Sequence, residues 1–168
     1  LPFASFRVSP LTRTESFSST LQRRGFVRES EESIMVFKGK LSEDRLNPEV
    51  EVREISEEEV GSFDELLVTC FDMPVIWKGV FDRLFLDWMR MGARNYLAYV
   101  DGKPVGTTSL FSSLKTGGVF NVGTLKEYRK RGVGTALTVH ALVDSVDAGN
   151  DLHTLQAEKG GNAERLYR

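Results

Sequence analysis

Residues 124–137 read Thr124-Leu-Lys-Glu-Tyr-Arg-Lys-Arg-Gly-Val-Gly-Thr-Ala-Leu137, and this stretch decides how the rest of the chain is interpreted. A β-rich run enters a short basic loop, two glycines stand one residue apart, and an apolar helical pattern follows. The start of a helix presents backbone N–H groups without intrahelical partners and the positive end of the helix dipole. Glycine lets the backbone approach a ligand closely, because it has no Cβ. The junction therefore predicts a site for an anion, above all a pyrophosphate.

Two familiar phosphate-binding loops do not fit this junction. A dinucleotide-binding fingerprint needs a third glycine shortly after the second, but Ala136 and Leu137 stand there. A P-loop needs a Gly-Lys-Ser/Thr triplet, and the sequence contains none. What remains is the pattern Arg-x-x-Gly-x-Gly, with Arg129, Gly132 and Gly134 in its specified positions.

This pattern resembles the acetyl-CoA signature of the GNAT superfamily of N-acetyltransferases. Its surroundings extend the resemblance, because the strand-like run Val119–Leu125 precedes it, and Leu152–Ala157 followed by Ala163-Glu-Arg-Leu-Tyr167 comes after. The resemblance covers roughly Val50 to Arg168. It implies an α/β (α+β) fold with a mixed, mostly antiparallel central sheet flanked by helices. It also implies an enzyme that moves an acetyl group from acetyl-CoA, as co-substrate, to a primary amine by direct transfer.

Composition is ordinary for a soluble globular protein. The 168 residues are 40% hydrophobic and 27% charged. A net charge of −2 and a pI near 5.8 give no overall attraction for nucleic acid or anionic membrane. No apolar run approaches the ~20 residues that span a bilayer, and Cys70 is the only cysteine. We therefore expect a cytoplasmic protein without a metal site and without nucleic-acid or membrane partners.

The chain divides into two predicted segments. Residues 1–48 form an N-terminal extension, with a helix ended by Gly25, a hairpin and an exposed linker. Within it, Leu21-Gln-Arg-Arg-Gly-Phe26 resembles the ending of a GNAT domain. The extension is therefore either the tail of a degenerate upstream GNAT-like half or an unrelated helix–hairpin appendage. Residues 49–168 form the GNAT-like acetyltransferase domain, from which the C-terminal strands of the family are missing, so we expect the sequence to be a fragment.

Local patterns predict the order of elements after residue 49. A strand over Val50–Ile55 leads into a helix that starts at Ser56 with a capping box to Glu59. A second helix carries aromatic residues at helical spacing from Trp77 to Trp88. Two strands then flank the turn Asp101-Gly102, a strong hairpin signal. The resulting order is strand, helix, helix, three antiparallel strands, helix, strand, helix.

The resemblance also assigns the cofactor site. Backbone N–H groups at the start of the helix hold the pyrophosphate, basic side chains surround it, and the backbone N–H groups of Val122 and Thr124 polarise the thioester carbonyl. Gly123, which lies between them, is expected to mark a β-bulge. The expected cofactor-binding residues are Val122, Thr124, Arg129, Lys130, Arg131, Gly132, Val133, Gly134, Thr135 and Asn162. Asn162 departs from the family pattern, which places its asparagine where Gly160 stands.

The resemblance implies that Tyr167 takes part in catalysis, because it stands where family members carry the tyrosine whose phenol protonates the coenzyme thiolate. The alternative is that Tyr167 is a tyrosine of the core. The backbone of Val122 acts on the carbonyl. The general base stays open between Glu127, Asp72 and Glu158 on the one hand and a water chain on the other, because Gly118 stands where some members carry a carboxylate.

Other functions are open at this stage. A catalytically silent acyl-CoA-binding or regulatory domain would explain the missing carboxylate and the shifted asparagine. The basic cluster Lys126–Arg131 would suit nucleic acid, but its shortness and glycines argue against that reading. The acceptor is a small-molecule or peptide amine that the sequence does not identify. Since family members often pair, a homodimer is a further expectation.

Overall fold

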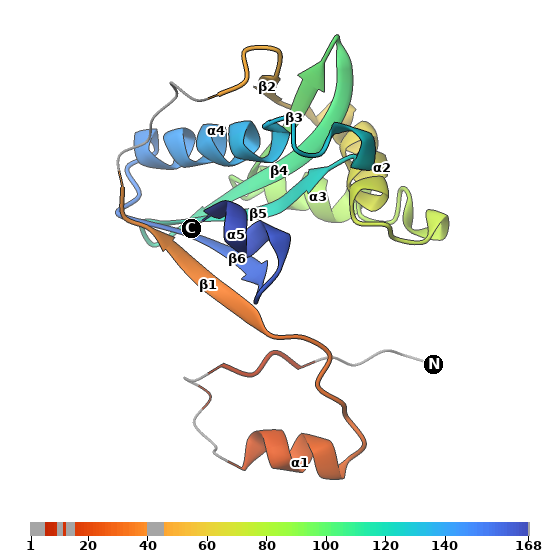
Figure 1. Cartoon of the computed structure of the whole chain (residues 1–168), viewed down its shortest axis with the longest axis vertical. Helices are drawn as coiled ribbons and strands as arrows, with labels where there is room; N and C mark the ends of the chain where they lie inside the picture. Colours follow the sequence, from red (N-terminus) through yellow and green to blue (C-terminus); the bar gives the residue numbers. More distant parts are fainter. Residues whose placement is uncertain (1–5, 10–11, 13–15, 40–45, 168) are drawn as a thin grey trace. The chain divides into compact units, whose positions relative to one another are not determined.

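A computed structural model of the chain describes residues 6–9, 12, 16–39 and 46–167, with the backbone alone for residues 166–167. Figure 1 shows its elements, with short 3-10 turns labelled η in the text. In chain order they are α1 (Phe17–Arg23), β1 (Glu32–Phe37), β2 (Glu51–Glu54), η1 (Glu57–Glu59), α2 (Val60–Cys70), η2 (Val75–Trp77), α3 (Asp82–Arg90), β3 (Arg94–Val100), β4 (Lys103–Ser113), β5 (Thr116–Thr124), η3 (Lys126–Tyr128), α4 (Val133–Asp147), β6 (Leu152–Glu158) and α5 (Asn162–Tyr167).

The chain forms two compact units, Leu1–Glu31 and Glu32–Arg168. In the first unit, the Phe6 ring meets the rings of Phe17 and Phe26 edge-on, with centroids 5.9 and 5.1 Å apart. α1 itself buries no residue. This unit is thus held by a few aromatic contacts, whereas the second unit carries the sheet and its hydrophobic core.

The second unit is built on a six-stranded sheet in the order β1-β6-β5-β4-β3-β2. All neighbours are antiparallel except β5 and β6, which run parallel and are joined through α4. α4 packs on one face of the sheet and α2 with α3 on the other (Figure 1). The predicted mixed, mostly antiparallel sheet flanked by helices is confirmed.

β1 differs from the sequence prediction in its partner. The sequence predicts a hairpin in which Phe26–Glu29 pairs with Ser33–Phe37, but residues 26–29 form no strand. β1 instead pairs antiparallel with β6 along its whole length, from Glu32↔Glu158 to Phe37↔His153. The boundary between the compact units accordingly lies before β1, whereas the sequence predicts it at residue 48. The upstream GNAT-like tail stays a prediction.

Alternation along β3 separates two hydrophobic clusters. Tyr96 and Ala98 are fully buried in the cluster on the α4 side, whereas Leu97 points to the cluster beneath α2 and α3. Successive side chains of a strand point to opposite faces, so one buried strand serves both layers. The core therefore fixes α4 and the α2–α3 pair against the same central strands.

The structure confirms the predicted capping box and hairpin turn, and it shifts the start of one predicted helix. The Ser56 N–H donates to the Glu59 carboxylate at 3.0 Å, as the capping box predicts, and the Arg53 guanidinium with this N–H lowers the pKa of Glu59 to about 2. The predicted turn at residues 101–102 is confirmed by two positive φ angles, 51° and 71°. The predicted second helix begins only at Asp82; η2 ends at Trp77, and Gly79, with φ 76°, lies in the turn between the two elements.

Candidate active site at the start of α4

The start of α4 is arranged to receive an anion. Gly132 stands at the N-cap with φ 81° and makes no side-chain capping bond. The first intrahelical bond runs from the Ala136 N–H to the Gly132 carbonyl at 2.9 Å, so the N–H groups of Val133, Gly134 and Thr135 precede the hydrogen-bonded ladder. The helix is 15 residues long, which gives it a full dipole. We call residues 129–135 the cradle.

Arg129 braces the cradle rather than reaching out of it. Its Nε donates to the Thr124 carbonyl at 3.1 Å, and its Nη2 donates to the Cys70 carbonyl at 3.2 Å. The guanidinium thus ties the end of β5 and the end of α2 to the loop. The sequence predicts Arg129 as a cofactor-binding residue; both of these bonds go to backbone carbonyls, and a contact of Arg129 with a cofactor stays a prediction.

The other cations of the cradle are partly paired. Arg131 lies 3.4 Å from the Glu49 carboxylate and over the Tyr128 ring, 5.3 Å from its centroid. Lys126, just before the cradle, lies 2.7 Å from the Asp72 carboxylate. Lys130 is exposed in the left-handed region with φ 63°. These contacts lie at the surface, where ion pairs contribute little and exchange readily for a phosphate.

A second brace comes from the segment before β2. The Asn47 side chain donates to the Arg131 carbonyl at 3.0 Å and accepts from the Glu49 N–H at 3.0 Å. A Cβ on Gly132 would lie 3.4 Å from that of Asn47. Sequence reasoning took this segment as an exposed linker, and its local composition carries no signal for a contact 84 residues away.

β5 bulges two residues before the predicted position. Thr107 pairs with Gly123 and Ser109 with Phe120, so two residues of β5 stand opposite one residue of β4. The bulge falls at Asn121, whose φ is 57°, and the Thr107 hydroxyl donates to its carbonyl at 2.8 Å. The predicted bulge at Gly123 is therefore wrong in position, since Gly123 stays in register.

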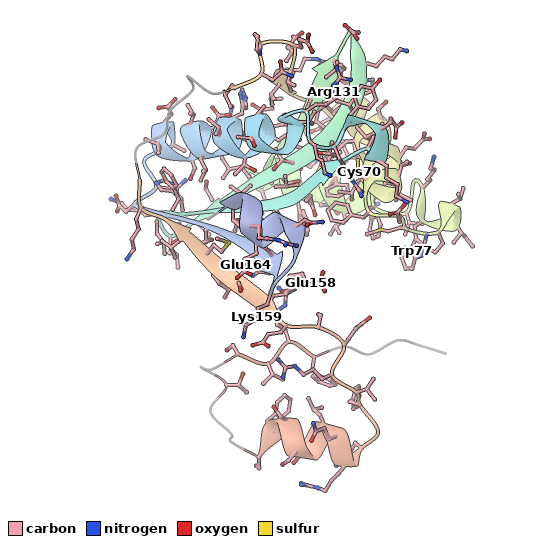
Figure 2. All side chains as sticks on the ribbon, viewed as in Figure 1. Cys70, Trp77, Arg131, Glu158, Lys159 and Glu164 are labelled. Carbon is pink, nitrogen blue, oxygen red and sulfur yellow. The ribbon has the colours of Figure 1, made fainter. Side chains whose placement is uncertain are left out.

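Gly123 has a packing role instead. A Cβ there would lie 2.7 Å from the Cys70 Cβ and 3.0 Å from the Phe71 ring. The missing side chain lets the end of α2 approach β5 closely. Burial raises the pKa of the Cys70 thiol to about 12, so this cysteine packs as a small apolar residue. Figure 2 labels Cys70 between α2 and β5.

β5 and β6 separate beside the cradle. Their parallel pairing runs from Thr116↔Leu152 to Val119↔Leu155 and ends there. β5 continues to Thr124 and β6 to Glu158 without pairing with each other. We call the place where these two strands no longer pair with each other the β5/β6 opening. The backbone groups of Val122 and Thr124 belong to this part of β5, where the sequence predicts the carbonyl-polarising donors.

The remaining predicted residues lie on short elements at the periphery. Glu127 is exposed on η3, and Asp72 is engaged by Lys126. Asn162 begins α5, and its side-chain Oδ1 accepts a 2.9 Å bond from the Arg165 guanidinium. Tyr167 is the last residue of α5, and its side chain lies outside the described part of the chain. The assigned roles of these residues stay predictions.

Two carboxyl groups beneath η2 were missed by sequence reasoning. Asp64 on α2 is fully buried, and one of its oxygens and one of Asp82 lack a hydrogen-bond partner. Burial raises the pKa of Asp64, and the Asp82 carboxylate adds to this, while the N–H groups of Gly79 and Phe81 act in the opposite direction. The pair thus joins α2 to the start of α3 with its carboxyls facing each other.

Asp64→Asn is expected to stabilise the fold at neutral pH by about 1 kcal/mol, because the amide can donate a hydrogen bond to Asp82. The folded-state pKa of Asp64 is raised, so ionisation disfavours the folded state and the penalty is complete at neutral pH. The gain should shrink as pH falls through the raised pKa toward the ordinary value near 4. Thermal unfolding at pH 7 and pH 4 measures it; an equal gain at both pH values contradicts the assignment.

An apolar surface extends outward from the same region. η2 and the turn after it expose Val75, Ile76, Trp77 and Val80, and Trp77 stacks on Phe81 with centroids 5.6 Å apart. Figure 2 shows Trp77 at the outer end of this segment. The sequence places Trp77 at the start of a stripe of aromatic residues at helical spacing, and the structure leaves its side chain exposed.

Neither a candidate metal centre nor a candidate membrane-spanning helix is found among the residues that the structure describes. They contain no cluster of three or more His, Cys, Asp or Glu side chains that could hold a metal ion. Within the same ranges, no helix combines the length and apolarity needed to cross a bilayer. The two histidines contact neighbouring side chains: His153 Nδ1 lies 2.8 Å from the Ser145 hydroxyl, and His140 lies 3.8 Å from Asp144.

Comparisons with known proteins cover the region of the chain that carries this site. The sequence profile of the Acetyltransferase (GNAT) family matches residues 61–168. A comparison with curated proteins found no match. Among solved structures, a functionally unknown conserved protein from Staphylococcus epidermidis is similar with a TM-score of 0.60 and 19% identity, over 92% of this chain and 61% of that one.

Two further solved structures carry acetyltransferase names. A PaiA N-acetyltransferase from Thermoplasma acidophilum in complex with coenzyme A gives a TM-score of 0.58 and 13% identity, over 70% of this chain and 85% of that one. A GCN5-related N-acetyltransferase from Kribbella flavida gives 0.58 and 18%, over 85% and 54%. At these identities the likeness concerns the fold. This chain spans 61% of the first of these structures and 54% of the last, and its match to the first includes residues before Val50.

Proposed function

Because this chain belongs to the GNAT family of acetyltransferases, we propose that it moves an acetyl group from acetyl-CoA to a primary amine by direct transfer within a ternary complex. The observation that carries the proposal is the cradle, where a left-handed Gly132 opens a 15-residue helix beside the β5/β6 opening. The acceptor is proposed to be a small-molecule or peptide amine.

The residues present fit a diphosphate-bearing coenzyme. Gly132 leaves the start of α4 without a side-chain cap, and the N–H groups of Val133, Gly134 and Thr135 point along the helix axis toward that end. A diphosphate there would also lie within reach of Lys130 and of Arg131, once the latter leaves Glu49. When bound, acetyl-CoA supplies a thioester whose carbonyl carbon accepts the amine.

Groups of the chain itself would act on the thioester and on the acceptor amine. Backbone N–H groups of Val122 and Thr124, on the part of β5 that does not pair with β6, would polarise the carbonyl. One well-aimed donor is worth about 3 kcal/mol in the transition state. The Tyr167 phenol would give its proton to the departing thiolate, and a carboxylate such as Glu127 or a chain of waters would take the proton of the amine.

Titration calorimetry with acetyl-CoA and detection of free coenzyme thiol against a panel of amines test this function. The panel should hold polyamines, amino acids, aminoglycosides and short peptides. Saturable binding with thiol release in the presence of one amine class is the expected result. Binding without release over the whole panel would favour the alternative, a silent acyl-CoA-binding domain, and absence of binding would contradict both.

Tyr167→Phe should lower turnover about a hundredfold while acetyl-CoA binding changes less than twofold, because only the proton donor is lost. The assay is thiol release at saturating substrates. Tyr99→Phe is the matched control, since that phenol bonds to Arg53 on the distant β2–β3 edge. Unchanged turnover in Tyr167→Phe would remove this residue from the mechanism.

A further inference from the structure

The last residues of β6 are held by β1. The pairing of β6 with β5 ends at Leu155. Beyond it, Gln156, Ala157 and Glu158 pair with Ile34, Ser33 and Glu32 of β1. α5 begins only four residues after β6 ends. On the part of the chain that the structure describes, β1 is therefore the strand that fixes the segment leading into α5.

A buried carboxylate attaches α5 to the same strand. The Ser33 hydroxyl donates to Glu164 Oε1 at 2.8 Å, and the Gly160 N–H donates to Glu164 Oε2 at 2.8 Å. Glu164 is only 7% exposed. A carboxylate is costly to bury unless it is hydrogen-bonded, and bonds to a charged acceptor are the strong ones. One side chain thus connects β1, the loop before α5 and α5 itself; Figure 2 labels Glu164 on α5.

β1 has two distinct faces. Ser33, Met35 and Phe37 are half-buried, and Phe37 packs against the cluster beneath α4. Ile34 and Val36 point the other way and are 67% and 42% exposed. The face that carries Ser33 is therefore the one through which β1 touches the rest of the fold, and Ile34 offers a position on the same strand that does not contact α5.

We propose that β1, which precedes the family-matched region, is a clamp that positions α5 at the β5/β6 opening, with Ser33 and Glu164 as positioning residues. The proposal rests on the proposed function, since α5 runs from Asn162 to Tyr167, the residues assigned to the coenzyme arm and the thiolate. Ser33 and Glu164 touch no reacting atom. They act by keeping α5 at a fixed distance from β5, the strand that carries Val122.

Ser33→Ala in the full chain tests the clamp. Turnover should fall about tenfold, because a small displacement of a catalytic group is costly. The KM for acetyl-CoA should rise by a smaller factor than turnover falls, because the cradle on α4 is untouched and only Asn162 on α5 is displaced. Hydrogen exchange should become faster over residues 156–167 and stay unchanged over 133–147. Ser33→Thr keeps the hydroxyl and should restore both turnover and exchange.

Two further variants make the outcome unambiguous. Glu164→Gln removes the charge that both donors address and should reproduce the loss of turnover, whereas Ile34→Thr on the exposed face of β1 should behave as wild type. Wild-type turnover and exchange in both Ser33→Ala and Glu164→Gln would overturn the clamp. Should the wild type acetylate nothing while Ser33→Ala still speeds exchange in residues 156–167, the clamp stands and the proposed function fails.

Discussion

Gly134→Glu is expected to weaken acetyl-CoA binding at least a hundredfold, which corresponds to about 2.7 kcal/mol. Gly134 is the second residue of α4 and one of the three whose N–H groups precede the hydrogen-bonded ladder. A glutamate in the first turn is favourable for the helix dipole, so the helix should form. The new carboxylate would either occupy the place where a diphosphate would bind or repel the diphosphate from that place. Titration calorimetry measures the change.

Gly134→Gln separates charge from bulk. Glutamine has the same shape as glutamate but no charge, so it should weaken binding by a smaller factor. Thermal unfolding should show both variants folded, because residue 134 has ordinary helical geometry and is absent from the positive-φ glycines. Binding of acetyl-CoA by Gly134→Glu at wild-type affinity would place the diphosphate elsewhere.

Gly106→Ala should lower the free energy of unfolding by about 3 kcal/mol, the upper range for an overpacked core. A Cβ on Gly106 in β4 would lie 2.7 Å from the Gly123 carbonyl oxygen and 2.9 Å from both Leu137 Cδ1 and Val133 Cγ1. A backbone carbonyl cannot move aside cheaply, so β5 or α4 must shift. Because Val133 begins α4, acetyl-CoA binding should weaken as well.

Differential scanning calorimetry would register this loss as a fall in Tm of roughly 10 °C. Gly61→Ala is the matched control. Gly61 lies in α2, and a Cβ there would come no closer than 4.0 Å to Asp82. Alanine should stabilise that helix by about 0.5–1 kcal/mol. A Gly106→Ala protein with the wild-type Tm would show that β4, β5 and α4 are not packed as described.

The features predicted correctly from sequence depend on local chemistry. The Asp101-Gly102 turn, the Ser56–Glu59 capping box and the helix after Gly132 each follow from residues within a few positions of one another. Their physical causes are short-range: positive φ at a turn, a reciprocal pair of hydrogen bonds, and an apolar stripe at helical spacing. The element order, and with it the family resemblance, rests on such signals.

The features missed from sequence are long-range. Ser33–Phe37 reads correctly as a strand, but nothing local distinguishes pairing with residues 26–29 from pairing with β6, more than a hundred residues later. Nothing in the local sequence of Arg129 predicts that its guanidinium donates to the Cys70 carbonyl of α2, 59 residues earlier. Such pairings are decided by the assembled tertiary structure. The position of the β5 bulge, which shifts the register between β4 and β5 by one residue, likewise cannot be predicted from the sequence pattern of β5 alone.

A crystal structure of the protein with coenzyme A tests the central claim most directly. The account predicts diphosphate oxygens within about 2.7–3.2 Å of the backbone nitrogens of Val133, Gly134 and Thr135, with the pantetheine arm running into the β5/β6 opening. A diphosphate bound away from the start of α4, or an arm that lies outside the opening, would contradict it.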